Sequence, residues 1–152
     1  MKAETNFAML LQMCREHNPS SLTSSADNAE EKIRSAIDFG LSLVPEDWSG
    51  KRVLILGCGD GYEVVTARER FGWQAYGITF HPEEYQSRVV DSSLLTMADI
   101  HGMPFDDESF DCVYSKETLE HVACPMLALI EINRVLRLGG SCFHLIADGW
   151  NK

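Results

Sequence analysis

The stretch Val53-Leu54-Ile55-Leu56-Gly57-Cys58-Gly59-Asp60-Gly61 decides the fold of this chain. Its first four residues are all apolar, and an apolar run without alternation is typical of a central strand buried on both faces of a parallel sheet. Glycines then recur at Gly57, Gly59 and Gly61, where a backbone without Cβ atoms can turn sharply and lie against a ligand. A helix is expected to begin at Tyr62 and to direct its free N–H groups toward the same ligand.

Two common phosphate-binding motifs do not fit this turn. A dinucleotide-binding fingerprint needs a further glycine where the chain has Tyr62. A P-loop needs a Gly-Lys-Ser/Thr sequence after the glycines, and none is present. A tight glycine turn that binds no ligand is the alternative interpretation.

From Arg52 onward, strand and helix patterns alternate, which is the signature of a parallel sheet covered by crossover helices. We interpret Gly139-Gly140 as the stop signal of the last helix. The expected strands are residues 53–56, 74–79, 94–98, 110–115 and 142–147, and the expected helices are residues 62–71, 82–90 and 125–138.

Ahead of the sheet, apolar residues at helical spacing predict two N-terminal helices, over residues 7–14 and 27–44. No linker, repeat or low-complexity tract divides the chain. We therefore expect a single domain over residues 1–152, with the N-terminal helices in 1–48 and the core in 49–152.

Four further motifs follow the glycine turn in a specific order: Asp99-Ile100-His101-Gly102-Met103-Pro104-Phe105, Ser109-Phe110-Asp111, Thr118-Leu119-Glu120-His121-Val122 and Arg134-Val135-Leu136-Arg137-Leu138-Gly139-Gly140. Together with the turn, they resemble the class I S-adenosylmethionine (SAM) dependent methyltransferases, in particular the type 11 small-molecule branch. The resemblance runs from about Arg52 to Ala147. It implies a three-layer α/β/α, Rossmann-like fold with a mostly parallel five-strand sheet of order 3-2-1-4-5.

The resemblance also implies where SAM binds. The glycine turn would cradle the methionine moiety, Asp99 would contact the adenine amino group, and Ile100 would pack on the adenine ring. The implied cofactor-binding residues are Gly57, Cys58, Gly59, Gly61, Thr79, Phe80, Asp99, Ile100 and Ser115.

The chain departs from the family pattern at two acidic positions. Ile55 stands where an acidic residue usually precedes the first glycine, and Thr79 stands where a carboxylate usually grips the ribose hydroxyls. Glu83 and Glu84 are nearby acids that can serve instead, although solvated residues in the first turn of a helix are the simpler interpretation. Complete members also add two strands after the fifth, so the alternatives are a natural minimal form, a segment supplied by a partner, or lost activity.

A SAM-dependent methyltransferase that acts on a small molecule is the predicted function. Because methyl transfer from SAM depends mainly on positioning, a base is needed only where the acceptor must lose a proton. His121 and Glu117, which follow the fourth strand, are the candidate catalytic residues. The alternatives are a non-catalytic SAM-binding regulatory subunit, sensor or pseudo-methyltransferase, and a SAM-consuming enzyme of another class.

Composition narrows the partners. A net charge of −10 disfavours nucleic acid, and no apolar run is long enough to span a membrane. Five cysteines without a Cys-x-x-Cys pair suit the cytoplasm, and the histidines lack partners at metal-ligand spacing, so no metal is expected. The apolar strand over 142–147 lies at the predicted sheet edge without a lysine, proline or acid, which predicts a homo-oligomer unless another part of the chain covers it.

Overall fold

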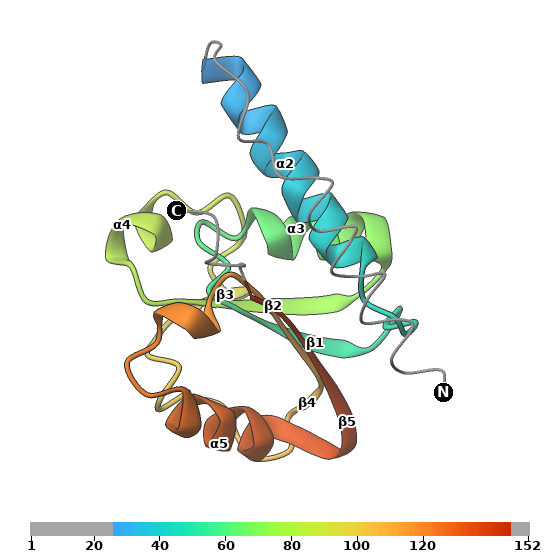
Figure 1. The fold of residues 1–152 in the computed structure, drawn as a ribbon, viewed down its shortest axis with the longest axis vertical. Helices are drawn as coiled ribbons and strands as arrows, with labels where there is room; N and C mark the ends of the chain where they lie inside the picture. Colours follow the sequence, from blue (N-terminus) through green and yellow to red (C-terminus); the bar gives the residue numbers. More distant parts are fainter. Residues whose placement is uncertain (1–25, 147–152) are drawn as a thin grey trace. The chain divides into compact units, whose positions relative to one another are not determined.

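The computed structural model describes residues 26–146, which fall into two compact units divided between Leu43 and Val44 (Figure 1). The first unit contributes helix α2 (Ala26–Ser42), which matches the helix expected over 27–44. The helix expected over 7–14 lies outside the described residues. The single-domain organisation stays a prediction.

The second unit contains a five-stranded sheet in the order β3-β2-β1-β4-β5, and every pair of neighbouring strands is parallel. The predicted fold class and strand order are therefore confirmed. The strands are β1 (Arg52–Leu56), β2 (Gln74–Thr79), β3 (Leu95–Met97), β4 (Phe110–Lys116) and β5 (Leu136–Leu145).

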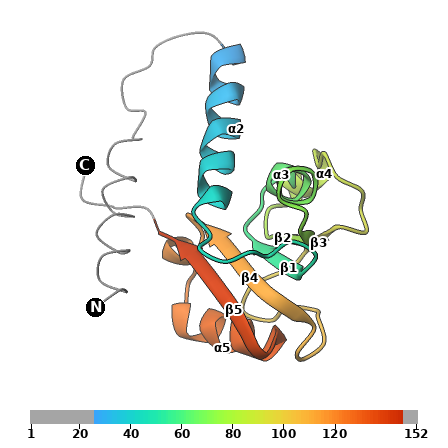
Figure 2. The ribbon, with the colours of Figure 1, turned by 90° about the vertical axis from the view of Figure 1, so that its right-hand side faces the viewer.

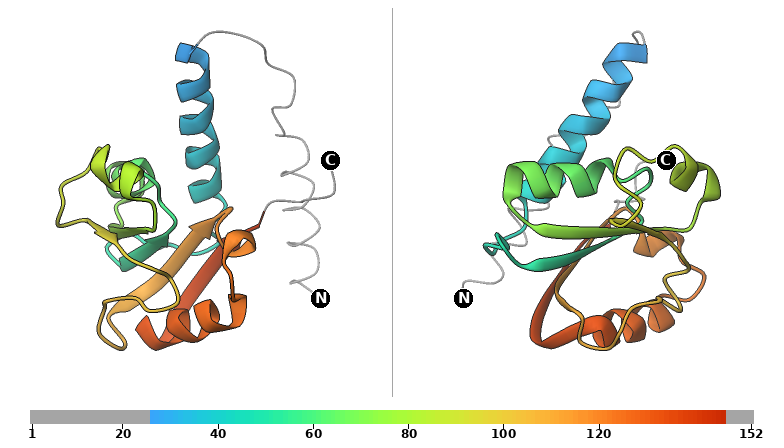
Figure 3. Two further views of the ribbon diagram at one scale, coloured as in Figure 1. Left: turned by 90° about the vertical axis from the view of Figure 1, so that its left-hand side faces the viewer. Right: turned by 180° about the vertical axis from the view of Figure 1, so that it is seen from behind.

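Helices cover both faces of this sheet, which gives the predicted three layers. Helix α3 (Tyr62–Phe71) lies on one face and helix α5 (Pro125–Val135) on the other (Figures 2 and 3). Two short elements, α4 (Pro82–Gln86) and the 3₁₀ helix η1 (Leu119–His121), follow β2 and β4. Each crossover therefore returns the chain to the same end of the sheet before the next strand begins.

Strand β1 is the centre of the core, because the side chains of residues 53–56 are all 0% exposed. On one face, Leu54 and Leu56 belong to a cluster that includes residues of α5. On the other face, Trp73 packs between Trp48 and Tyr114, with ring centroids 5.1 and 6.0 Å away. Burial of each large apolar side chain contributes about 1.5–3 kcal/mol, so both faces stabilise this strand.

The end of α5 corrects the sequence-based prediction. The helix ends at Val135 rather than 138, because Leu136 is already extended and pairs with Phe110. The pairing then shifts, so that Cys112 lies opposite Ser141 and the residues between form a bulge in β5. Gly139-Gly140 thus lies inside a bulged strand and does not stop the helix.

Helix α4 is also shorter than expected and ends at Gln86 rather than 90. The backbone N–H of Val89 donates to the carbonyl oxygen of Asp60 at 2.9 Å, which draws the segment after the helix onto the glycine turn. The Ser87 hydroxyl bonds the Glu83 carbonyl at 3.0 Å, and such side-chain bonds compete with continued helix.

Candidate functional site

The carboxyl ends of the parallel strands all lie on one side of the sheet, where open α/β sheets bind ligands (Figure 1). This row of strand ends is called the carboxyl edge, and it is distinct from the outer edge formed by β5. Four segments that the sequence singles out reach this edge. They are the glycine turn after β1 (57–61), the segment after β2 (79–84), the loop after β3 (99–105) and the segment after β4 (115–121).

Gly57 holds the turn after β1 against the segment after β4. Its φ is +66°, and a Cβ atom there would lie only 2.5 Å from the hydroxyl oxygen of Thr118. That hydroxyl lies 3.1 Å from the carbonyl oxygen of Leu56 and so covers the end of the central strand. No residue with a side chain fits at Gly57 without moving Thr118.

Several N–H groups of the turn are already used. The N–H groups of Gly57 and Cys58 both donate to the carbonyl of Ile78, at 2.9 and 3.2 Å. The Tyr62 N–H donates to the side chain of Asp60 at 3.1 Å, so the first helical donor is capped rather than free as expected. Within residues 26–146, the N–H groups of Gly59 and Asp60 have no hydrogen-bond partner, which leaves them for a ligand.

Cys58 faces away from the candidate site. Its side chain is 5% exposed, and its sulfur lies 3.5 Å from the carbonyl oxygen of Ile78. Burial raises the pKa of the thiol far above its ordinary value, so the group stays protonated. Only the backbone of Cys58 is placed to contact a ligand.

The end of β2 carries a carboxylate after all. The Thr79 hydroxyl donates to Oε2 of Glu84 at 2.7 Å. The same carboxylate lies 3.9–4.0 Å from the position of a Cβ atom on Gly59. Glu84 is therefore held between the end of β2 and the glycine turn, which corrects its interpretation as a solvated helix residue. Phe80, beside Thr79, is 65% exposed.

Asp99 is exposed at the same edge, and its Oδ1 atom is fixed by the next residue but one. That oxygen accepts a hydrogen bond from the His101 backbone at 2.9 Å and lies 2.6 Å from the His101 ring. The backbone hydrogen bond lowers the pKa of Asp99, so the carboxylate is ionised near neutral pH. Ile100 is half-buried and packs against the core cluster, which leaves part of its side chain at the edge.

Helix α5 fastens the rest of the loop after β3. The Arg134 guanidinium donates to the carbonyl oxygens of Met103 and Phe105 at 2.8 and 2.7 Å. The Glu131 carboxylate accepts from the Met103 N–H at 2.9 Å and from Arg134 at 2.8 Å. Charge-assisted bonds of this kind are among the strongest in proteins, so the loop is held firmly. The motif at 134–140 gave no sign of this role.

The segment after β4 divides into a buried and an exposed part. The Ser115 side chain is fully buried, and its hydroxyl lies 2.8 Å from Nδ1 of His144 rather than at the edge. Burial lowers the pKa of His144, so its ring is neutral near pH 7. Glu117 and His121 are both exposed. No hydrogen bond joins these two among residues 26–146, so they do not form a preassembled pair.

A buried acid, Glu63, escaped the sequence analysis. It is the second residue of α3 and is 6% exposed, and its carboxylate makes no hydrogen bond within residues 26–146. Burial raises its pKa to about 7; Lys116 opposes this shift and Glu117 adds to it. The fully buried Tyr114 hydroxyl also has no partner in this part of the chain.

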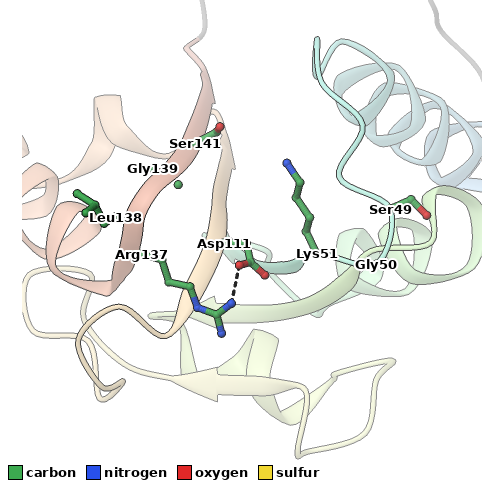
Figure 4. Close-up of a pocket in the computed structure, with 9 residues that line it drawn as sticks. Ser49, Gly50, Lys51, Asp111, Arg137, Leu138, Gly139 and Ser141 are labelled. Carbon is green, nitrogen blue, oxygen red and sulfur yellow. Dashed lines mark hydrogen bonds and ion pairs between the residues drawn. The ribbon is translucent and has the colours of Figure 1, made fainter.

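A cavity of about 490 Å³ opens at the amino-terminal ends of the strands, on the side of the sheet opposite the candidate site (Figure 4). Arg137 in its wall binds Asp111 at 2.6 Å, and Lys51 lines it as well. None of the predicted site residues lines this cavity. Among residues 26–146, no group of three His, Cys, Asp or Glu side chains is arranged to hold a metal, and no helix is long and apolar enough to cross a membrane.

Comparison with known proteins identifies a family for this chain. The family described as a methyltransferase domain matches residues 54–144 of the chain. The 2-methyl-6-phytyl-1,4-hydroquinone methyltransferase of Synechocystis is 29% identical in an alignment 138 residues long that covers 82% of this chain and 41% of that protein. The chain thus spans less than half of the length of this relative.

Two solved structures share the fold. One is the complex between a methyltransferase activator of Haloferax volcanii and a protein described as a methyltransferase (28% identity, TM-score 0.64, 82% of this chain and 61% of that one). The other is phosphoethanolamine N-methyltransferase 2 of Haemonchus contortus in complex with SAM (22% identity, TM-score 0.64, 72% of this chain and 27% of that one).

The raised pKa of Glu63 predicts that stability falls as the pH rises. The unfolded carboxyl ionises near its ordinary pKa of 4.5 and the folded one near 7, so the folded state binds the proton more tightly. In the parent, this ionisation should lower the free energy of unfolding by about 3 kcal/mol between pH 4.5 and 8, and Glu63→Gln should abolish that decrease. Denaturant unfolding across this range measures it. Glu69→Gln, on the exposed side of α3, should leave the pH dependence unchanged; parallel curves for Glu63→Gln and the parent would contradict the prediction.

Proposed function

Because the chain belongs to the methyltransferase domain family, we propose that it binds SAM and transfers the methyl group to a small-molecule acceptor. The observation that carries the proposal is the meeting of the glycine turn, the Thr79–Glu84 pair and the Asp99 loop at one sheet edge. The residues present fit the cofactor, because the N–H groups of Gly59 and Asp60 have no partner among residues 26–146 and the Glu84 carboxylate faces Gly59 across the turn.

In this proposal each segment binds one part of SAM. The backbone at Gly57, Cys58, Gly59 and Gly61 holds the methionine moiety, and Glu84, aimed by Thr79, accepts hydrogen bonds from the ribose hydroxyls. Phe80 and Ile100 flank the adenine, and Asp99 accepts from its amino group. Ser115 is fully buried and contributes only by its contact with His144, which joins the ends of β4 and β5 beneath the site. When bound, SAM supplies an activated methyl group for in-line displacement.

On the acceptor side, Glu117 and His121 are the groups that can take a proton from an acceptor. Both are exposed beyond the end of β4, so an incoming small molecule can reach them. A base contributes only when the acceptor must lose a proton in the reaction. Formation of S-adenosylhomocysteine with an acceptor present separates a transferase from a non-catalytic SAM-binding protein.

Gly59→Val tests the cofactor site. Gly59 has a φ of +56°, which strains any residue with a side chain, and its Cβ position already lies 3.9 Å from the carboxyl carbon of Glu84. A valine there would therefore fill the space between the turn and Glu84 in which the ligand is proposed to lie. We expect calorimetry to show no SAM binding. Gly50→Val is the control, because Gly50 has a similar φ of +72° and open space but precedes β1 at the other end of the strand. SAM binding by Gly59→Val at the parent's affinity would overturn the assignment.

Glu84→Gln tests the ribose contact. A hydrogen bond to a charged group contributes ~1.5–3 kcal/mol, so loss of the charge should weaken SAM binding by about ten- to a hundred-fold. Glu83→Gln removes the same charge from an exposed neighbour and should change the affinity little. Equal effects of the two substitutions would show that SAM binding depends on the total negative charge of these acids and not on a hydrogen bond between Glu84 and the ribose.

We also propose that the protein is a homo-oligomer through the outer edge of β5, which pairs with no further strand among residues 26–146. Cys142 is exposed within β5 and Ile146 is exposed directly after it, and unpaired strand edges favour association. Light scattering should give a multiple of the monomer mass, and Ile146→Lys should shift the protein toward monomer. A monomeric parent at all concentrations would refute this interface.

The proposed location is the cytoplasm. The described cysteines, Cys58, Cys112, Cys124 and Cys142, are all free thiols. Burial raises the pKa of Cys112 to about 11, which keeps it protonated and unreactive. Free thiols of this kind suit a reducing compartment.

A further inference from the structure

His101 joins the Asp99 loop to the start of α5. Its Nδ1 atom lies 2.6 Å from Oδ1 of Asp99, while its Nε2 atom accepts a hydrogen bond from the backbone N–H of Cys124 at 3.2 Å. Cys124 is the residue that directly precedes α5. The imidazole is therefore held at both nitrogens, and its side chain is only 21% exposed.

These two contacts set the tautomer of the ring. Because the Cys124 N–H donates to Nε2, that nitrogen must carry the lone pair. The proton of the neutral ring then lies on Nδ1, which donates it to Asp99. Oδ1 of Asp99 thus receives two hydrogen bonds, one from the His101 ring and one from the His101 backbone.

The second oxygen of Asp99 is left for a ligand. Within residues 26–146, Oδ2 of Asp99 makes no hydrogen bond, and the side chain is 53% exposed. A carboxylate with one oxygen held by two donors cannot rotate freely. Its other oxygen consequently keeps one direction, as a pure hydrogen-bond acceptor.

We propose that His101 is a positioning residue that aims Asp99 and so makes the site select a 6-aminopurine over a 6-oxopurine. The inference rests on the proposed function, since it takes the adenine of SAM as the group that Asp99 meets. A fixed carboxylate oxygen accepts from an exocyclic amino group. It repels a carbonyl oxygen at the same position, because both groups are acceptors, and a carboxylate free to turn away would discriminate less.

The structure makes this role separable from a general role in holding the loop. Arg134 and Glu131 bind the loop further on, at Met103 and Phe105, and these bonds do not involve His101. Removal of the His101 ring therefore leaves most of the loop attached to α5. A loss of selectivity can then be distinguished from a loss of the loop.

The test compares two ligands, S-adenosylhomocysteine and its 6-oxo analogue S-inosylhomocysteine, by calorimetry. We expect the parent to prefer the adenine compound. His101→Phe should lower that preference about tenfold, because the hydrogen bond from the adenine amino group to the charged Asp99 is no longer held in one direction. His101→Asn is the matched variant, because its amide N–H can replace Nδ1 but does not reach Cys124. It should retain most of the preference.

A double-substitution cycle completes the design. Asp99→Ala should abolish the preference, and His101→Phe should add nothing further in that background. If His101→Phe weakens both ligands equally, or if His101→Asn loses as much preference as His101→Phe, the positioning role is overturned while the cofactor site stands. If the parent binds neither ligand, the proposed function falls with it.

Discussion

The complete burial of β1 is the constraint on which the rest of the structure depends. A strand without solvent on either face must pair its backbone groups with a neighbour on each side, and β1 does so with β2 and β4. The chain can leave such a strand only at its end, where the glycine turn begins. There the absence of a Cβ on Gly57 admits Thr118, which bonds the last carbonyl of the strand. The packing that buries β1 therefore also determines the shape of the candidate site.

The two acids missing from the strands have counterparts in the helices that follow. Ile55 and Thr79 carry no charge, yet Glu63 and Glu84 lie in the first turns of α3 and α4. The partial positive charge of a helix N-terminus favours a carboxylate in the first turn, but at Glu63 burial outweighs this effect and raises the pKa to about 7. Glu84 reaches the end of β2 through its bond from Thr79. An acid can therefore serve a strand end from several residues further along the chain.

Local sequence patterns predicted what depends on local sequence. The apolar run at 53–56 and the alternation of strands and helices gave the parallel sheet, since these properties need no knowledge of distant partners. The predicted end of α5 was wrong because Leu136 pairs with Phe110, which lies 26 residues earlier in the chain. The burial of Glu63, the hold of Thr79 on Glu84 and the link from His101 to Cys124 escaped for the same reason. Each depends on which side chains the finished fold brings together.

The charge around the turn bears on the order of binding and release in the proposed reaction. Asp60, Glu63 and Glu84 all act electrostatically on the buried Cys58, so the surroundings of the turn are acidic. SAM carries one more positive charge than S-adenosylhomocysteine, because the sulfonium becomes a neutral thioether when the methyl group leaves. An acidic site attracts the cation more strongly than its neutral-sulfur product. In the proposed reaction these carboxylates therefore favour exchange of spent cofactor for fresh cofactor.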